Sequence, residues 1–185
     1  MIKQILLFPL WLPHLVCYLC SENRDVIDKD TVAWTTYRPG LLRKGQSSRL
    51  ISLLVNQKDF RTQFYHRIGK PRVFLRCLLP GLNDCSLEGC QIGEGWVLLH
   101  GYGTVINGWA KIGKNCTMYH HVTIGIASDI YGVPTIGDNV FIGAGAKILG
   151  KIKIGNHVKI GAGAVVVNDI PDNSTVIGPK AKVLG

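Results

Sequence analysis

Acidic residues are scarce in this chain. Its 185 residues include 12 Asp and Glu against 21 Lys and Arg, which gives a formal net charge of +9. This excess predicts attraction to anions, of which phosphorylated cofactors, nucleic acid and acidic lipid surfaces are the main classes. The sequence also lacks a nucleic-acid-binding motif and a platform of interleaved aromatic and basic side chains. We therefore expect no nucleic-acid partner.

A cysteine framework is absent as well. The six cysteines are scattered along the chain, whereas a disulfide scaffold is typical of small secreted domains that lack a core. With 46% hydrophobic residues, this chain is long enough for one domain with a substantial core and an accessory region. Cys17 and Cys20 have C-x-x-C spacing, but no second pair of ligands matches them. We expect free thiols in a reducing, cytoplasmic compartment and no bound metal.

The N-terminus lacks an uninterrupted hydrophobic run. Residues 1–20 are nearly all apolar, yet Pro9 and Pro13 interrupt them, and no small-x-small cleavage site follows. Both features argue against a transmembrane helix and a signal peptide. We expect helical pieces that pack on the body of the protein or in an oligomer contact. Peripheral contact with a membrane is the second interpretation.

Short helices are expected in the rest of an N-terminal region that spans residues 1–80. One begins after Asp30, and two more cover residues 49–55 and 60–68, the last of them with Asp59 as its N-cap. Apolar residues recur at every fourth position of this last helix and predict one packed face, formed by Phe60, Phe64 and Ile68.

A six-residue repeat fills the second half of the chain. Hexads such as I-G-D-N-V-F and I-G-A-G-A-K run without interruption from Ile136 to Pro171, and further hexads extend the pattern back to Ile92. Each has an aliphatic residue first, usually Gly second, and a small or β-branched residue fifth. This spacing fits neither a helical period nor strand alternation, but it is typical of a hexapeptide β-helix. We predict a mainly β domain over residues 81–185, a parallel β-helix of about four coils. Isoleucines eighteen positions apart should stack along one wall, namely Ile106, Ile124, Ile142 and Ile160.

The repeat is interrupted twice. Its frame slips by two residues at Thr104 and Val105, and Pro134 occupies a fifth position where a small inward residue is expected. We interpret residues 126–135 as a loop that leaves the coil, with a regular hexad as the alternative. Because ligand contacts concentrate in loops on a rigid scaffold, these interruptions are the candidate functional segments.

Several segments together resemble the hexapeptide acyltransferase superfamily. They are D-F-R-T-Q-F-Y-H-R-I-G, L-H-G-Y-G-T-V-I-N, H-H-V-T-I-G and the G-A-G-A hexads, and the similarity covers roughly residues 60–185. The branch that they resemble contains serine O-acetyltransferases and colanic-acid or capsule polysaccharide O-acetyltransferases. The resemblance implies a left-handed β-helix, a homotrimer with sites between neighbouring subunits, and acetyl-CoA as the donor.

The same resemblance assigns the catalytic residues. His100, within L-L-H-G-Y-G, matches the catalytic histidine of the family. An imidazole titrates near neutral pH, so it can take the proton of a hydroxyl group as the oxygen attacks the thioester. Asp84 and Asp129 are the candidates to orient His100.

The resemblance also implies which residues contact the acceptor and the donor. His120 and Tyr102 are expected to line the acceptor site, and because adjacent residues of a strand point to opposite faces, only one of His120 and His121 can face it. Small residues of the hexads would leave a flat wall for the pantetheine arm, although they also suit tight corners. C-terminal lysines would meet the CoA phosphates. The donor residues so assigned are Thr123, Gly125, Ala144, Gly145, Ala162, Gly163, Lys180 and Lys182.

The chain departs from the serine acetyltransferase pattern at two places. The aspartate that pairs with the histidine falls on Cys85, and Gly132, Val133 and Pro134 replace an Arg-His-Pro loop. The carboxylate of serine would then lack its partner. We therefore expect the acceptor to be a sugar hydroxyl of a glycan precursor, for capsule, exopolysaccharide or lipopolysaccharide, with serine as the alternative. A gamma-class carbonic anhydrase and a non-catalytic hexapeptide scaffold are further alternatives.

Overall fold

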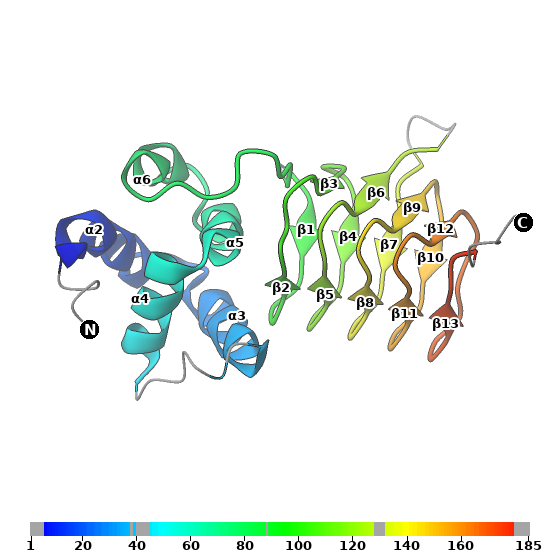
Figure 1. The fold of residues 1–185 in the computed structure, drawn as a ribbon, viewed down its shortest axis with the longest axis horizontal. Helices are drawn as coiled ribbons and strands as arrows, with labels where there is room; N and C mark the ends of the chain where they lie inside the picture. The colour runs from blue at the N-terminus through cyan, green and yellow to red at the C-terminus, as the bar shows by residue number, and fades with distance from the viewer. Residues whose placement is uncertain (1–5, 38, 40–44, 88, 128–131, 180–185) are drawn as a thin grey trace, which may run out of the picture.

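The computed structural model describes residues 6–37, 39, 45–87, 89–127 and 132–179. A helical region leads into a triangular stack of short parallel strands, with the last strand, β13, at the end opposite the helices (Figure 1). The last helix ends at Leu78 and the first strand begins at Gln91. Helices and strands therefore occupy opposite ends of the molecule.

Five α-helices form the described part of the N-terminal region: α2 (Phe8–Leu19), α3 (Arg24–Tyr37), α4 (Gln46–Asn56), α5 (Lys58–Ile68) and α6 (Arg72–Leu78). The predicted helices over residues 49–55 and 60–68 are confirmed by α4 and α5. Two details were wrong. Helix α3 begins before Asp30, and α5 begins at Lys58, so that Asp59 lies in its first turn and is not its N-cap.

One apolar core holds these helices together. Its largest fully buried side chain is Trp34, and Val97 and Leu99 of the first coil also contribute to it. The predicted face of α5 is confirmed, because Phe60 and Phe64 are each 1% exposed. Helix α2 continues through Pro13, where we expected separate helical pieces. Within the described residues, no helix has both the length and the apolar character that crossing a membrane requires.

Three parallel sheets form the faces of a prism. In the two-residue strands the inward position is apolar, most often Ile or Val, and it is buried in every one except the last strand, where Val176 is partly buried. This confirms the predicted parallel β-solenoid of about four turns, consistent with a left-handed β-helix. The first sheet contains β1 (Gln91–Ile92), β4 (Lys111–Ile112), β7 (Thr135–Ile136) and β10 (Lys153–Ile154). The second contains β2 (Val97–Leu98), β5 (Thr117–Met118), β8 (Phe141–Ile142), β11 (Lys159–Ile160) and β13 (Thr175–Val176). The third contains β3 (Val105–Ile106), β6 (Thr123–Gly125), β9 (Lys147–Leu149) and β12 (Val165–Val166).

The register of the sheets corrects the predicted wall of isoleucines. Ile106 pairs with Ile124 as expected, but Ile124 pairs with Ile148 and not with Ile142. Ile142 lies in the second sheet, where it pairs with Ile160. The four isoleucines therefore divide between two walls.

A longer second coil explains this shift. The positions of the paired residues Ile112 and Ile136 differ by 24, whereas those of Ile136 and Ile154 differ by 18. The six additional residues lie between Gly125, which ends β6, and Thr135, which begins β7, in the segment where we predicted a loop over residues 126–135. Residues 128–131 of that segment lie outside the described part of the chain.

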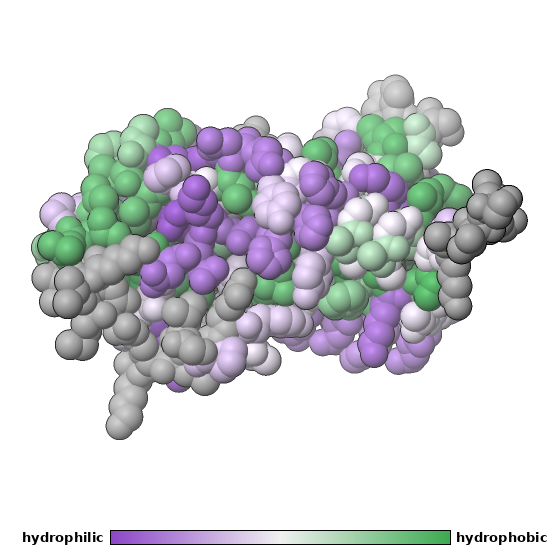
Figure 2. Space-filling view, in the orientation of Figure 1, coloured by the Kyte–Doolittle hydropathy of each residue, from purple (hydrophilic) through white to green (hydrophobic). Residues whose placement is uncertain are grey.

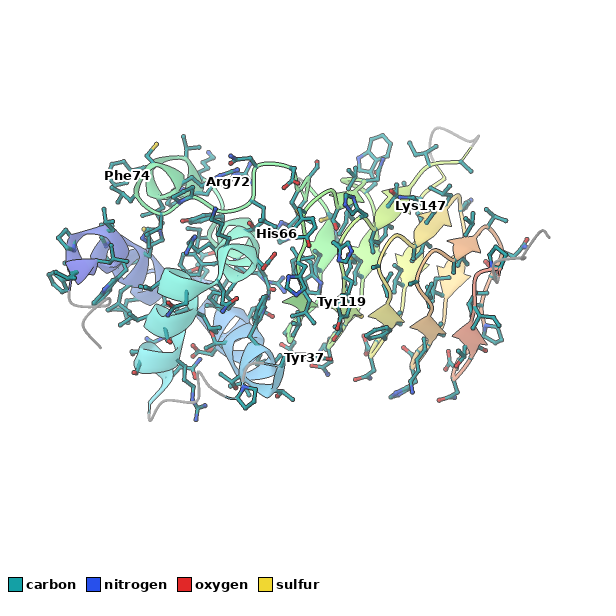
Figure 3. The ribbon with its side chains drawn as sticks, viewed as in Figure 1. Tyr37, His66, Arg72, Phe74, Tyr119 and Lys147 are labelled. Atoms are coloured by element: carbon teal, nitrogen blue, oxygen red, sulfur yellow. The ribbon has the colours of Figure 1, made fainter. Side chains whose placement is uncertain are left out.

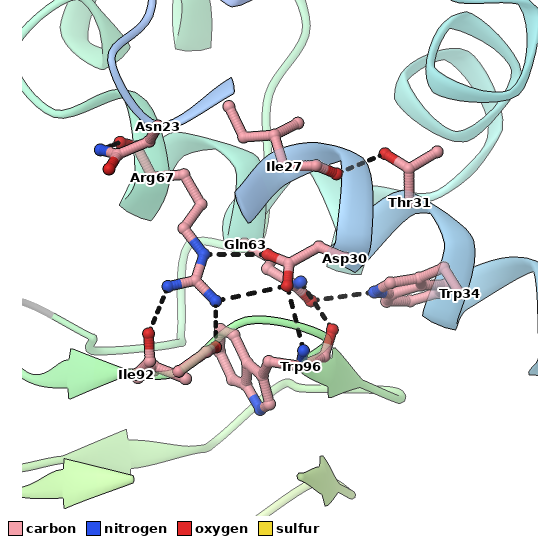
Figure 4. Close-up of polar contacts among 10 residues, drawn as sticks. Asn23, Ile27, Asp30, Thr31, Trp34, Gln63, Arg67, Ile92 and Trp96 are labelled. Atoms are coloured by element: carbon pink, nitrogen blue, oxygen red, sulfur yellow. Dashed lines mark hydrogen bonds and ion pairs between the residues drawn. The ribbon is translucent and has the colours of Figure 1, made fainter. Parts of the chain in front are cut away.

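A buried ion pair joins the helices to the first coil (Figure 4). Nε of Arg67 donates to Oδ2 of Asp30 at 2.9 Å, and the two side chains are 7% and 2% exposed. Arg67 also donates to the carbonyls of Ile92 and Gly93, at 2.5 and 2.6 Å, and Asp30 accepts the N–H of Trp96 at 3.0 Å. Because each charge has several partners, the pair fixes α3 and α5 against the prism.

Two imidazoles, buried His14 and half-buried His66, predict that acid destabilises the protein. Burial lowers the pKa of His14 and that of His66 from 6.5 to about 4. Between these values the unfolded chain binds more protons than the folded one, so the free energy of unfolding should fall as the pH falls from about 6.5 to about 4. Urea denaturation across this range measures the effect. The double variant His14→Gln, His66→Gln should have a weaker pH dependence, and an unchanged dependence would contradict the assignment.

Candidate active site

One corner of the prism carries most of the predicted site residues. It connects the second sheet to the third and consists of residues 100–103, 119–122, 143–146 and 161–164. We call it the His100 corner. Main-chain hydrogen bonds of 2.8 to 3.0 Å run along it, from the N–H of Gly103 to Asp84, of His121 to Tyr102, of Gly145 to His120 and of Gly163 to Ala144.

Tyr102 lies among three imidazoles at this corner. Its ring stacks on that of His120, with centroids 5.3 Å apart and an interplanar angle of 25°. The rings of His121 and His100 lie 5.8 and 6.4 Å from the same phenol. Nδ1 of His120 is buried and has no hydrogen-bond partner among the described residues. No three His, Cys, Asp or Glu side chains in the described ranges are arranged to hold a metal ion.

The prediction that His120 and His121 point to opposite faces was wrong. Both lie in a corner and not in a strand, and their ring centroids are 5.5 Å apart. His121 has a φ of 54°, in the left-handed region, which turns the chain sharply. The position that His121 occupies is a glycine in the other coils, namely Gly103, Gly145 and Gly163, with φ of 64°, 72° and 67°. The backbone conformation of the corner therefore brings both imidazoles to the same phenol ring.

His100 is exposed and is also left-handed, with a φ of 54°. Such a conformation costs a residue with a Cβ roughly 1–2 kcal/mol, so contacts around it must hold it. Oδ1 of Asp59 accepts the N–H of Gly101, the next residue, at 2.8 Å. Asp59 reaches the corner from the first turn of α5. Our sequence analysis missed this role, because the only signal was its place at the start of the D-F-R-T-Q-F segment.

Of the two carboxylates predicted to orient His100, Asp84 has no side-chain hydrogen bond to the described part of the corner. Asp84 is exposed and contributes its main-chain oxygen to Gly103. Asp129 lies outside the described residues. Cys85, at the position of the family's aspartate, is half-buried, and burial together with the nearby Asp84 carboxylate raises the pKa of its thiol to about 12. A thiol that stays protonated at neutral pH cannot replace a carboxylate beside an imidazole.

The predicted donor residues fall into three groups. Ala144, Gly145, Ala162 and Gly163 lie in the His100 corner, one coil and two coils beyond His120. Thr123 begins β6 directly after the corner, whereas Gly125 ends that strand. The third group, Lys180 and Lys182, lies outside the described residues.

Lys147 of β9 is half-buried and contacts the chain next to the imidazoles. Its Nζ donates to the carbonyl of His121 and to Oγ1 of Thr123, both at 3.0 Å. Figure 3 shows the lysine on the prism, on the opposite side of Tyr119 from the helices. This cation therefore braces the main chain directly after the three imidazoles.

Replacing Gly103 by Ala is expected to disturb the corner more than replacing Gly163 by Ala. Both glycines have positive φ, so an added Cβ strains each by about 1–2 kcal/mol. At Gly103 that Cβ would lie 2.2 Å from Nδ1 of His121, whereas at Gly163 it would meet nothing within 4 Å. Gly103→Ala should therefore lower the Tm further. Thermal unfolding of the two variants measures this, and equal losses would contradict the clash.

Known proteins match most of this chain. A family model described as bacterial transferase hexapeptide (six repeats) matches residues 134–168. The serine acetyltransferase of Helicobacter pylori (strain ATCC 700392 / 26695) is 48% identical over 98 residues, which are 52% of this chain and 57% of the relative. That of Staphylococcus xylosus is 49% identical over 92 residues, which are 49% of this chain and 43% of the relative. The chain thus spans about half the length of these relatives.

Solved structures extend the match into the helices. Serine acetyltransferase from Neisseria gonorrhoeae in complex with serine superposes with a TM-score of 0.67 and 32% identity, over 86% of this chain and 68% of that one. The serine acetyltransferase apoenzyme of soybean superposes with a TM-score of 0.63 and 31% identity, over 87% of this chain and 68% of that one. These findings contradict our expectation of a polysaccharide O-acetyltransferase with a glycan acceptor. That expectation relied on two missing side chains, whereas the match covers helices and prism together. The chain belongs to the hexapeptide-repeat acetyltransferase family, and its relatives are serine acetyltransferases.

Proposed function

We propose that this protein transfers an acetyl group from acetyl-CoA to the hydroxyl group of L-serine, with His100 as the general base. The observation that carries the proposal is the match of 86% of the chain to a serine acetyltransferase in complex with serine. The exposed imidazole of His100, beside a column of small residues, supports it.

Acetyl transfer needs a base because a neutral hydroxyl group is a poor nucleophile. The His100 imidazole takes the hydroxyl proton as the serine oxygen forms a bond to the thioester carbon. The tetrahedral adduct then collapses, the carbon–sulfur bond breaks, and the imidazolium returns the proton to the departing sulfur. The products are O-acetylserine and the free thiol of CoA. A base in this position is worth roughly 10²- to 10⁴-fold in rate.

His120 and Tyr102 supply the acceptor contacts in this proposal. Nδ1 of His120 is a buried polar atom without a partner among the described residues, and such an atom gains from a ligand hydrogen bond. Gly132 and Val133 offer no cationic side chain for a carboxylate. We therefore assign recognition of the serine carboxylate to the imidazoles around Tyr102.

Asp59 is a positioning residue in this proposal. Its carboxylate holds the N–H of Gly101 and so fixes the left-handed turn that presents His100. It acts through the main chain and is not assigned a contact with substrate. Asp59 thus provides, from the helical region, a carboxylate that positions His100, which Cys85 at the family's aspartate position does not provide.

Asp59→Ala is expected to lower kcat by about tenfold, because the imidazole of His100 remains but is no longer held in the orientation that the reaction needs. The KM for acetyl-CoA should change little. Asp59→Asn keeps an oxygen that accepts the N–H of Gly101, so it should restore most of the activity. Steady-state kinetics on both variants measure this. If the two lose activity equally, the charge of Asp59 matters and the positioning role is wrong.

The donor lies along the small residues of the His100 corner, and the active assembly is a trimer with sites between prisms. Val105 and Val165 are exposed on the third sheet, and a second prism against this wall would bury them, which is favourable for apolar side chains. Thr123, Ala144 and Ala162 border the same wall.

The test of the proposed function is an acceptor panel. Purified protein is incubated with acetyl-CoA and L-serine, L-threonine, a set of sugars or no acceptor, and release of CoA thiol is followed with mass detection of O-acetylserine. Thiol release should depend on L-serine and disappear in His100→Asn. Release that occurs with sugars and not with serine would overturn the proposal.

A further inference from the structure

The outer surface of helices α2 and α6 is apolar and exposed. On α2 it consists of Phe8, Leu12, Val16 and Leu19, which recur every three or four residues and are between 36% and 51% exposed. On α6 it consists of Val73 and Phe74, which are 73% and 65% exposed. The two helices pack against each other. Together these six residues form what we call the α2–α6 face, and Figure 2 shows hydrophobic residues gathered at this end of the molecule, away from the prism.

The opposite side of α2 is fixed to the protein. His14 and Tyr18 are fully buried, and Nε2 of His14 lies 2.8 Å from the hydroxyl of Tyr65 on α5. The hydroxyl of Tyr18 donates to Asp28 on α3 at 2.7 Å. Helix α2 is thus held in one orientation by polar contacts within the core, and its outward side chains cannot turn inward.

The charges around the α2–α6 face are mostly positive. Helix α2 contains no Asp, Glu, Lys or Arg, and its His14 is buried on the opposite side. Helix α6 contains two arginines and no acid, Lys70 precedes it, and both Lys70 and Arg76 are exposed. Glu22 follows α2, so the positive charge is concentrated at the α6 side.

We propose that the α2–α6 face docks on an anionic lipid bilayer. The strength of such binding increases with the apolar area that inserts and with the attraction of basic side chains to anionic lipids, and this face supplies both. Helix α2 has 12 residues, about 18 Å at 1.5 Å each, so it lies in the plane of the membrane surface and does not cross a core about 30 Å thick. A second copy docked through the same face is a poorer occupant, because it would bring the exposed cations Lys70 and Arg76 of both copies to one contact, whereas an anionic headgroup complements them.

Vesicle flotation with the full chain tests this proposal independently of any enzymatic activity. We compare vesicles of phosphatidylcholine with vesicles that contain about one quarter phosphatidylglycerol. The protein should float with the anionic vesicles, and added salt should weaken its binding. Val73→Ser, Phe74→Ser should reduce the fraction bound by about tenfold or more, because it removes apolar area from the face. Lys70→Gln, Arg76→Gln should remove the preference for the anionic lipid.

Val32→Ser on α3 is the matched control, since Val32 is an equally apolar side chain, 49% exposed, outside the face. It should bind as the wild type does, and circular dichroism should show every variant folded. Absence of flotation, or flotation that the Val73 and Phe74 changes leave intact, would overturn the proposal. A second contrary result would come from analytical ultracentrifugation. If the wild type self-associates but does not bind vesicles, and Val73→Ser, Phe74→Ser abolishes the self-association, the face joins two copies of the chain.

Discussion

Replacing His100 by Asn is expected to lower kcat for acetyl transfer by about 10²- to 10⁴-fold, the contribution of a general base. An amide cannot take a proton at neutral pH. Asn also tolerates the left-handed conformation that His100 adopts, with a φ of 54°, so the corner should keep its shape. Release of CoA thiol in the presence of L-serine measures the loss, and circular dichroism checks the fold.

His157→Asn is the matched control for this variant. His157 is also an exposed histidine at a left-handed corner, with a φ of 56°, but it lies at a different corner of the prism. Its replacement should leave kcat and KM unchanged. A drop of less than about tenfold in His100→Asn would rule out general-base catalysis by His100.

Replacing Asp30 by Ala is expected to lower the free energy of unfolding by about 3–5 kcal/mol. The change leaves the guanidinium of Arg67 buried without its counter-charge, and it removes the acceptor of the Trp96 N–H. Because this network joins the helices to the first coil, loosening it should also weaken the link between α5 and the His100 corner. Urea denaturation followed by circular dichroism measures the loss.

Two comparisons separate the buried pair from ordinary surface charge. The double variant Asp30→Ala, Arg67→Met should recover part of the stability, because it removes the unpaired charge. Lys29→Ala breaks the exposed ion pair of Lys29 with Glu94 and should cost far less. If Asp30→Ala and Lys29→Ala were equally mild, the buried pair would not fix the junction.

The prism could be predicted from the sequence because its signal is local and repeated. A hexad places one aliphatic residue inward wherever it occurs, so the number of coils follows from counting. The stacking of particular isoleucines could not be counted in this way. Ile124 and Ile142 belong to different walls, because the second coil is longer than the third, and only the strand register reveals how many residues leave the coil.

The grouping of side chains around Tyr102 could be predicted only where a sequence motif contains them. His100 stands in such a segment, and the sequence placed Tyr102 and His120 beside it. Asp59 reaches Gly101 across 42 positions and from a different kind of structure, and no periodicity connects a helix to a corner. The orientation predicted for His121 was wrong because it assumed a strand, in which successive side chains point to opposite faces. His121 lies in a corner with left-handed backbone, where side chains do not alternate in this way.

The unequal coils have a consequence for how the length of the chain can change. Paired residues in successive coils of the first sheet are separated by 20, 24 and 18 positions, yet the strands stay in register. Additional residues can therefore enter at a corner without rearranging the core. A change in the length of the connection between β6 and β7 should therefore leave the strand register of the prism unchanged.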